Sequence, residues 1–252
     1  MSRYFCDLHI HSCLSPCADD DMTPANIAGM AMLNGLNIVA LTDHNTAKNC
    51  PAFFTHAKKY GLIPVAGMEL TTSEDIHVVC LFRNLSDALE FEKFVDERRP
   101  DFENRPDVFG HQYIMDENDQ VVGEEKILLI NAADISLDMA YEQVIKRGGV
   151  CYPAHIDRVS NGIVSVLGSF PDEPLFSAYE LNRESAYEEY LSRFPKLSHL
   201  SKTVSSDAHR LCDISEKVFS VELCDEPYSS ELVRNALFDY LLGKQSGGNN
   251  NG

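Results

Sequence analysis

Basic residues are scarce in this sequence. Its 252 residues include 21 lysines and arginines against 39 aspartates and glutamates, which gives a formal net charge of −18. A broad nucleic-acid-binding face needs clustered lysine and arginine, and an anionic membrane surface attracts the same residues. We therefore expect no long duplex nucleic acid and no membrane among the partners. The composition leaves the oligomeric state open.

Long apolar runs and paired cysteine motifs are also missing. No segment approaches the ~18 consecutive apolar residues of a membrane-spanning helix, and the N-terminal MSRYFCDLHIHS lacks the basic and apolar stretches of a secretory signal. The eight cysteines form no CxxC pair, and several lie in apolar runs, where a reduced thiol packs as a small hydrophobe. We expect a cytoplasmic protein with reduced cysteines.

Short apolar runs alternate with helical patterns along most of the chain, which is typical of βα units around a parallel sheet or barrel. The runs predict strands at 4–11, 37–44, 62–70, 76–82, 149–155, 176–182, 203–209 and 218–224. The patterns between them predict helices at 24–34, 47–60, 86–98, 136–147, 184–194 and 229–242. We predict one α/β domain over 1–245, with an irregular excursion containing a hairpin at about 99–130, and a disordered tail at 246–252.

Titratable side chains collect at the ends of five predicted strands. His9 and His11 are two residues apart on a strand, as are Asp207 and His209, so each pair shares a face. Three further strands end in a single such residue, namely His44, Glu69 and His155. One histidine or aspartate at a strand end is more often a hydrogen-bonded structural residue than a ligand.

Loops at the carboxyl ends of barrel strands converge over one pocket, so these side chains are expected to meet there. Burying so many ionisable groups together is costly unless cations compensate them. Imidazole and carboxylate ligands without thiolate suit Zn, Mn or Fe, and so many nitrogen donors argue against Ca or Mg alone. The sequence therefore predicts a site for two or three divalent ions.

Five motifs occur in a fixed order over residues 5–209: DLHIHS, LTDHN, GMEL followed by HVV, PAH, and SSDAH. In this respect the chain resembles the PHP (polymerase and histidinol phosphatase) family of metal-dependent phosphoesterases. The resemblance implies a distorted (β/α)7 barrel, similar to a TIM barrel, with a centre of two or three metal ions. It also nominates His77, which begins a predicted strand and which spacing alone would not select.

The resemblance implies three sets of metal ligands, which are His9, His11, Glu69 and Asp207 for one ion, Glu69, His77 and His155 for a second, and Asp19, His44 and His209 for a third. Family members commonly read SDG in the first loop, where this chain has SPCADDDMTP. Spacing from Pro24 favours Asp19 as the loop ligand, and Asp20 is the alternative. Glu69, Asp207 and His209 are the expected catalytic residues. Asp43 precedes His44, and Asp7 precedes the pair of His9 and His11. Their side chains are expected to differ in direction from the ligands and to support them.

Six neutral imidazoles and three carboxylates carry about −3, and two or three divalent ions add +4 to +6, so the pocket would be positive and attract phosphate. A hydroxide that bridges two metals can attack phosphorus, and we find no G-x-S-x-G, G-x-x-x-x-G-K-[ST] or G-x-G-x-x-G motif that would indicate another chemistry. Guanidinium groups pair well with phosphate, and Arg158 and Arg183 follow strand ends, although each could equally be a surface residue paired with a carboxylate.

The sequence therefore predicts a hydrolase of small phosphate esters, such as a nucleotide, a bisphosphate nucleotide or a short oligoribonucleotide. Two alternatives remain at this point. One is a histidinol-phosphate phosphatase, which uses the same chemistry. The other is a non-catalytic metal-binding PHP module, in which the ions only stabilise the barrel or sense metal.

Overall fold

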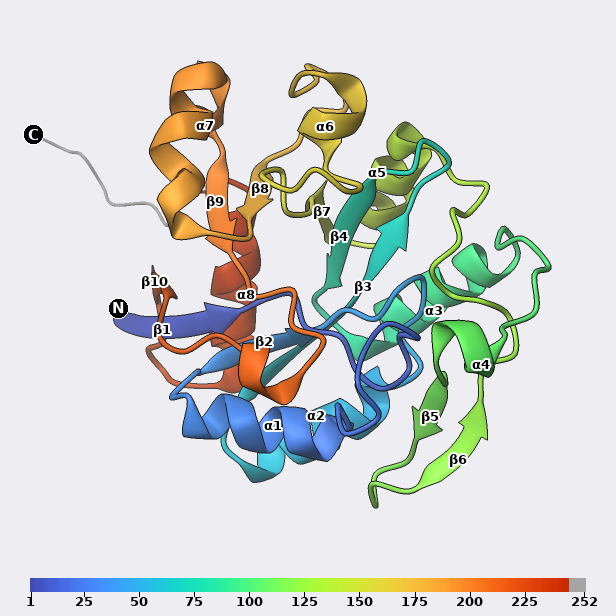
Figure 1. Ribbon diagram of the computed structural model, residues 1–252. Helices are drawn as coiled ribbons and strands as arrows, with labels where there is room; N and C mark the ends of the chain where they lie inside the picture. The colour runs from blue at the N-terminus through green and yellow to red at the C-terminus, as the bar shows by residue number, and fades with distance from the viewer. Residues whose placement is uncertain (245–252) are drawn as a thin grey trace, which may run out of the picture.

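A curled sheet of six strands forms the centre of the computed structural model, which describes residues 1–244 (Figure 1). The expected tail at 246–252 lies outside the described residues. The strand order is β10 (Phe219–Leu223), β1 (Ser2–Asp7), β2 (Ile38–Leu41), β3 (Ile63–Thr71), β4 (His77–Phe82) and β7 (Val150–Pro153). Strands β1, β2 and β3 run parallel, whereas the β1–β10, β3–β4 and β4–β7 pairs are antiparallel.

A second, two-stranded sheet pairs β8 (Ala178–Leu181) with β9 (Ser201–Val204) in parallel. Strand β8 packs beside β7, and the chain after β9 meets the chain after β1 through a parallel bridge between Ile10 and Ala208. The fold is therefore mixed α/β with a curled sheet, and the expected parallel (β/α)7 barrel is not confirmed. Strands β4 and β10 run against the others, and in the described residues no strand ladder joins β7 to β8.

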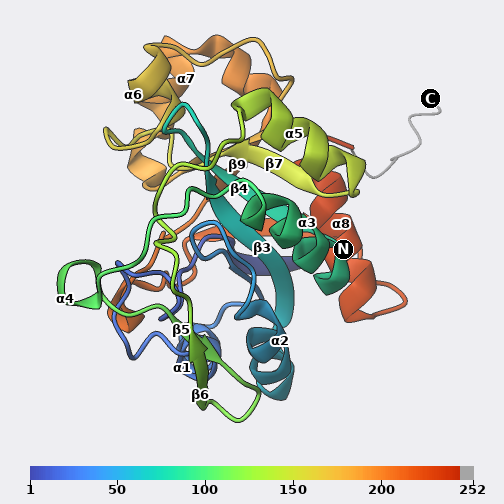
Figure 2. The same cartoon turned by 90° about the vertical axis from the view of Figure 1, so that its right-hand side faces the viewer.

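Helices surround the two sheets. They are α1 (Pro24–Leu33), α2 (Cys50–Lys59), α3 (Leu85–Asp96), α5 (Leu137–Lys146), α7 (Tyr187–Arg193) and α8 (Ser230–Leu241). Helix α2 packs on β3, α3 on β3 and β4, and α5 on β7, as Figure 2 shows for α3 and α5. Because helices cover one face and the interior fills the other, every residue of β2 and β3 is buried, which explains their continuous apolar runs.

The irregular segment at 99–130 contains the short helix α4 (Pro106–Phe109) and a hairpin of β5 (Tyr113–Met115) and β6 (Val121–Glu124). The hairpin lies at the edge of the molecule, near α1 and α2 (Figures 1 and 2). Asn49 holds it there, because its side chain donates to the Tyr113 carbonyl and accepts from the Met115 N–H. The structure also contains a short helix α6 (Ile163–Leu167), which the sequence pattern did not predict.

Helix length and composition bear on membrane insertion. Within residues 1–244, no helix has both the length and the apolar character needed to cross a bilayer.

Candidate metal centre

The predicted ligands lie at one rim of the curled sheet. His9 and His11 follow β1, His44 follows β2, His155 follows β7, and Asp207 and His209 follow β9. His77 begins β4, yet it pairs with Thr71 at the end of β3, because β3 and β4 form an antiparallel hairpin. The antiparallel β4 therefore brings the start of a strand to the rim where the other strands end, which explains why spacing alone did not select His77.

The Glu69 carboxylate is the centre of this rim and is 1% exposed. Its Oε1 lies 2.7 Å from His77 Nδ1, 2.9 Å from His155 Nε2 and 3.4 Å from His9 Nε2. Its Oε2 lies 3.0 Å from His44 Nδ1 and 3.3 Å from His11 Nε2. One buried carboxylate thus faces five imidazoles that come from four different strands.

Three groups of side chains place their donor atoms within 4.8 Å of one another, namely His9, His11, Glu69 and Asp207; His44, Glu69 and His77; and His11, His44 and His209. The first group is the set that the family resemblance implied. The other two groups differ from the implied sets, since His44 takes the place of His155 beside Glu69 and His77, and His11 takes the place of Asp19. Because Glu69, His11 and His44 each belong to two groups, neighbouring ions in these groups would share ligands.

Asp19 lies outside these three groups of described residues. Its side chain is 55% exposed, and its Oδ2 lies 3.7 Å from Arg210 Nε. Only its backbone approaches the rim, where the Asp19 N–H donates to the His209 carbonyl at 3.0 Å. Asp20 is also exposed. The lengthened first loop therefore turns its carboxylates toward solvent.

Two buried atoms indicate that the groups fit divalent ions. His44 Nδ1 and Asp207 Oδ1 are shielded from solvent; Glu69 Oε2 and His11 Nε2 lie 3.0 and 3.1 Å from them, but neither contact has the geometry of a hydrogen bond. Buried polar atoms are normally paired, so atoms left free beside other donors are typical of metal ligands. The donors are imidazole nitrogens and carboxylate oxygens, which suit Zn, Mn or Fe. The structure therefore has side chains that could hold several divalent ions, and it leaves their identity open.

Protonation in this cluster follows from the contacts. Burial opposes ionisation of Glu69, but His77, His9 and His44 outweigh it and hold the pKa of Glu69 well below its usual value. Burial opposes protonation of His11, but the adjacent Asp207 and Glu69 carboxylates outweigh it and raise its pKa to about 9. Burial, with a contribution from His11, lowers the pKa of His44 to about 4.

Burial and neighbouring charges shift the pKa values of His209 and His9 in opposite directions. Burial and the nearby His11 lower the pKa of His209 to about 3. Burial also acts to lower the pKa of His9, but Glu180 and Glu69 outweigh it and raise the pKa well above its usual value. In the metal-free protein at neutral pH, His9 and His11 are therefore protonated, while His44 and His209 are neutral.

Glu180 supports two of the rim histidines and was missed by the sequence interpretation. It is fully buried in β8, its Oε1 lies 2.8 Å from His9 Nδ1, and the same oxygen accepts the His155 N–H at 3.1 Å. A carboxylate that binds the far nitrogen of a histidine fixes the tautomer and the ring orientation. The available signal was an acidic residue inside the apolar strand AYEL, since an unpaired carboxylate is rarely buried.

Asp43 and Asp7 hold the loops that carry the ligands. Asp43 accepts hydrogen bonds from the hydroxyls of Ser12 and Ser15, and Ser15 Oγ lies 3.0 Å from His11 Nδ1. Asp7 accepts from the backbone N–H groups of Ser206 and Ser215. These contacts agree with the supporting roles expected of Asp7 and Asp43.

The backbone at two of the rim residues is strained. His155 has φ 28° and Asp207 has φ 52°, in the left-handed region where such residues cost about 1–3 kcal/mol each. The turn after His155 is closed by the Arg158 N–H, which donates to the His155 carbonyl at 2.8 Å. Gly162 must be glycine here, because a Cβ would lie 2.5 Å from the Arg158 carbonyl oxygen. Residues 155–162 are thus a tightly specified loop at the site.

A cavity of about 140 Å³ opens at the rim and is lined by His44, Glu69, His77, His155, Arg158, Ser160, Asn161, Asp207 and His209. Arg158 enters this cavity and pairs with Asp207 through Nη1 and Oδ2 at 2.5 Å. Arg183 is 70% exposed, and its Nε lies 3.8 Å from Asp157. Of the two predicted phosphate-binding arginines, the structure places only Arg158 at the rim.

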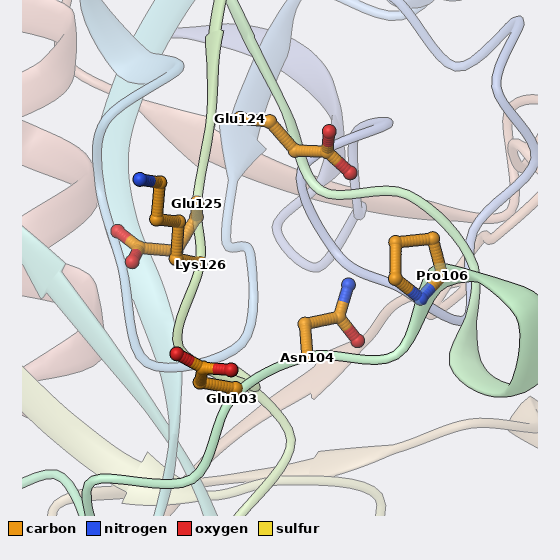
Figure 3. A pocket seen from close by; sticks show the side chains of 6 residues that line it. All are labelled: Glu103, Asn104, Pro106, Glu124, Glu125 and Lys126. Carbon is orange, nitrogen blue, oxygen red and sulfur yellow. The ribbon is translucent and has the colours of Figure 1, made fainter.

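A separate cavity of about 350 Å³ lies in the irregular segment, lined by Glu103, Asn104, Pro106, Glu124, Glu125 and Lys126 (Figure 3). None of these residues belongs to the three groups described above. Chemistry that depends on the clustered histidines therefore belongs at the rim.

The chain is similar to several known proteins. It is 33% identical to a 5'-3' exoribonuclease of Haemophilus influenzae over an alignment of 78 residues. This alignment spans 30% of this chain and 27% of the relative. Endonuclease Q from Pyrococcus furiosus matches with a TM-score of 0.66 and 17% identity over 98% of this chain and 57% of that one. A protein from Bifidobacterium adolescentis, assigned as a metal-dependent phosphoesterase, matches with a TM-score of 0.56 and 20% identity over 81% and 87% of the two chains.

The expectation that long duplex nucleic acid is excluded is wrong. Endonuclease Q is solved in complex with a 27-mer duplex that carries an abasic lesion at the active site, and it matches this chain with a TM-score of 0.62 and 18% identity over 98% of this chain and 58% of that one. Net charge sums over the whole surface, whereas a duplex contacts one face and is held by the local field of that face. A charge of −18 therefore does not rule out this class of partner.

The family model described as PHP domain matches residues 7–160, which is more than half of the chain. That segment contains His9, His11, His44, Glu69, His77 and His155, while Asp207 and His209 lie beyond it. The match identifies this chain as a member of the PHP domain family, whose members are metal-dependent hydrolases, and the donors clustered at the rim agree with it.

Proposed function

We propose that this chain is a phosphoesterase that uses two or three divalent ions, with Zn, Mn and Fe as the candidates. The observation that carries the proposal is the buried Glu69 carboxylate, which belongs to two of the three donor groups and lies within 3.4 Å of five imidazoles. The ligands would be His9, His11, His44, Glu69, His77, His155, Asp207 and His209. When bound, such ions supply a water of lowered pKa and stabilise the charge that develops on a phosphoryl group.

The other side chains of the rim prepare this chemistry. Glu180 orients His9, and Ser15, held by Asp43, orients His11, so the donors are fixed before an ion arrives. Arg158 lies in the cavity with a guanidinium group that matches the geometry of phosphate oxygens. His209 is 25% exposed and neutral at pH 7, so an unprotonated ring nitrogen is available to bind an ion at the open side of the rim.

The size of the cavity bears on the substrate. At about 140 Å³ it is smaller than the 300–1,000 Å³ typical of sites that enclose a whole small molecule. A phosphoryl group is expected to enter it while the organic part of the ester remains outside. This favours phosphate esters that expose a terminal phosphate, such as a nucleotide or a short 5'-phosphorylated oligoribonucleotide.

The test is ester hydrolysis by protein depleted of metal and reloaded with Mn²⁺ or Zn²⁺, measured as phosphate release for the monoesters and as strand cleavage for the oligoribonucleotide and the duplex. The substrates are nucleoside monophosphates, a bisphosphate nucleotide, histidinol phosphate, para-nitrophenyl phosphate, a short 5'-phosphorylated oligoribonucleotide and an abasic duplex. We expect the reloaded protein to hydrolyse at least one ester and the Glu69→Gln variant to lose this activity. The matched variant Glu222→Gln, changed at a side chain that is 65% exposed, should keep the activity. Reloaded protein that cleaves none of them would contradict the proposal.

A further inference from the structure

A second cavity, of about 400 Å³, adjoins the metal centre. We call it the side pocket. Arg158 and Asp207 line both this cavity and the smaller one at the rim, so the Arg158–Asp207 ion pair stands between the two. Its volume falls within the range of cavities that enclose small organic ligands. The side pocket is therefore large enough for the part of a phosphate ester that the rim cavity cannot hold.

The contacts of Asn182 fix the side of the pocket nearest Arg158. Its Nδ2 donates to the carbonyls of Ser205 and Ser206, at 3.4 and 3.0 Å. Because both N–H groups are directed at backbone carbonyls, Oδ1 is the atom turned toward Arg158, with 3.5 Å to Nη2. Asn182 thus presents an acceptor, and Arg158 is held between this acceptor and Asp207.

Two further polar groups in the side pocket have no strong partner. Ser205 is 2% exposed, and its Oγ has no hydrogen-bond partner among the described residues. Asp213 lines the same pocket, and in the part of the chain that the structure describes no lysine, arginine or histidine forms an ion pair with it. A buried hydroxyl without a partner costs free energy unless a ligand pairs with it. These groups are therefore available to a ligand.

The other serines of the pocket are already engaged. Ser215 Oγ donates to Asp7 at 2.6 Å, and Ser206 Oγ accepts from the Ala208 N–H. The remaining wall is apolar, formed by Val204, which is buried, and Val218, which is 56% exposed at the open side. The side pocket thus combines an apolar wall with an acceptor at Asp213 that forms no ion pair, the Asn182 acceptor that faces Arg158, and a free hydroxyl at Ser205.

We propose that the side pocket binds the nucleoside part of the phosphate ester whose phosphoryl group lies at the metal centre, an inference that rests on the proposed function. A nucleobase has apolar ring faces that suit the valine wall and edge N–H groups that suit the acceptors, and a ribose adds O–H donors. The Asp213 carboxylate disfavours a second negative charge at this place, so the group bound there is uncharged. Asp213 and Ser205 are specificity-determining residues of the reaction.

The same nucleoside chemistry is offered by a free nucleotide and by the terminal nucleotide of a nucleic acid. Both are tested as substrates of Mn²⁺-loaded protein, with adenosine and uridine 5'-monophosphates as one arm and a 5'-phosphorylated oligoribonucleotide as the other. Para-nitrophenyl phosphate serves as the ester that lacks a nucleoside. Metal content and thermal midpoint are measured for every variant, so that loss of ions or of folding is recognised.

We expect Asp213→Asn and Ser205→Ala to raise KM for the nucleotide arm by at least ~10-fold, the equivalent of about 1.4 kcal/mol. Their kcat/KM for para-nitrophenyl phosphate should stay within about twofold of the unmodified protein. Asp101→Asn, a matched change at an exposed aspartate that lines none of the cavities described above, should alter neither substrate. Chemical shift changes in nitrogen-labelled protein on adding adenosine alone should locate at Ser205 and Asp213 and vanish in Asp213→Asn.

The outcomes separate the two proposals. If none of the esters tested, including the oligoribonucleotide, is hydrolysed, the proposed function fails, and this inference fails with it. If esters are hydrolysed but both variants change KM equally for nucleotides and para-nitrophenyl phosphate, or adenosine leaves the side pocket unperturbed, only this inference is overturned. A KM effect confined to the oligoribonucleotide or to the free nucleotides identifies which source of the nucleoside the pocket accepts.

Discussion

Metal binding to the group formed by His9, His11, Glu69 and Asp207 should release about two protons per ion near pH 7. In the metal-free protein, neighbouring carboxylates outweigh the effect of burial, raise the pKa of His11 to about 9 and raise that of His9 well above its usual value. An imidazole coordinates a metal only through an unprotonated nitrogen. An incoming ion must therefore displace the protons that these carboxylates hold in place.

The cost follows from the pKa of His11. A value of about 9 lies two units above pH 7, and at about 1.4 kcal/mol per unit its deprotonation costs about 3 kcal/mol. His9 adds a cost of the same sign. Apparent affinity should therefore rise with pH, by up to ~100-fold per unit between about pH 6.5 and 8.5 while both histidines are still protonated in the free protein, and the slope should fall once His11 titrates near pH 9.

Calorimetric titration of metal-depleted protein with Mn²⁺, in two buffers of different protonation enthalpy, counts these protons directly. Asp207→Asn provides the comparison, since it removes one of the carboxylates that raise the pKa of His11, and it should release fewer protons with a shallower pH dependence. Binding that releases no protons and is independent of pH over this range would refute the electrostatic account of the cluster.

Four further outcomes are expected. Glu69→Gln should lower phosphate release by at least ~10²-fold and reduce the metal content measured by mass spectrometry, because it removes a carboxylate that two donor groups share. Glu180→Gln should weaken metal binding by about 10–100-fold while kcat recovers at saturating metal, since the residue orients His9 and the backbone of His155 and belongs to none of the donor groups. In urea titrations of metal-depleted protein, buried His44 and His209, with pKa values of about 4 and about 3, should each contribute a loss of about 3 kcal/mol of stability between about pH 6.5 and 4, because each stays neutral while the unfolded chain takes up the proton; His44→Gln should remove about half of that loss. Gly162→Ala should lower stability by about 1–3 kcal/mol, because its Cβ would lie 2.5 Å from a backbone carbonyl oxygen; an unchanged thermal midpoint would contradict this contact.

Much of the fold could be predicted from local pattern. Thr23 and Pro24 mark the start of α1, where the Thr23 hydroxyl accepts the Asn26 N–H as an N-cap, and the buried runs of β2 and β3 identify central strands. Strand direction could not be predicted in this way. An antiparallel β4 has the same apolar run as a parallel one, so the reversal that brings His77 to the rim is set by the β3–β4 hairpin and not by composition.

The candidate site, like the fold, could be predicted from the sequence only in part. The strand-end residues could be nominated because carboxyl ends of parallel strands meet at one edge, and the structure does bring His9, His11, His44, Glu69, His155, Asp207 and His209 to one rim. The loop ligand could not be fixed, because the direction of an exposed side chain such as Asp19 depends on partners like Arg210 that are distant in sequence. Glu180 was missed because its partner, His9, lies 171 residues away.

Anomalous diffraction from crystals loaded with Mn²⁺ tests the central claim most directly, which is that donors from separate strands form one metal centre around Glu69. The account predicts at least two anomalous peaks, with Glu69 oxygens coordinating both ions and one ion also held by His9, His11 and Asp207. Peaks that lie only elsewhere on the molecule, or no peak within bonding distance of the Glu69 carboxylate, would contradict it.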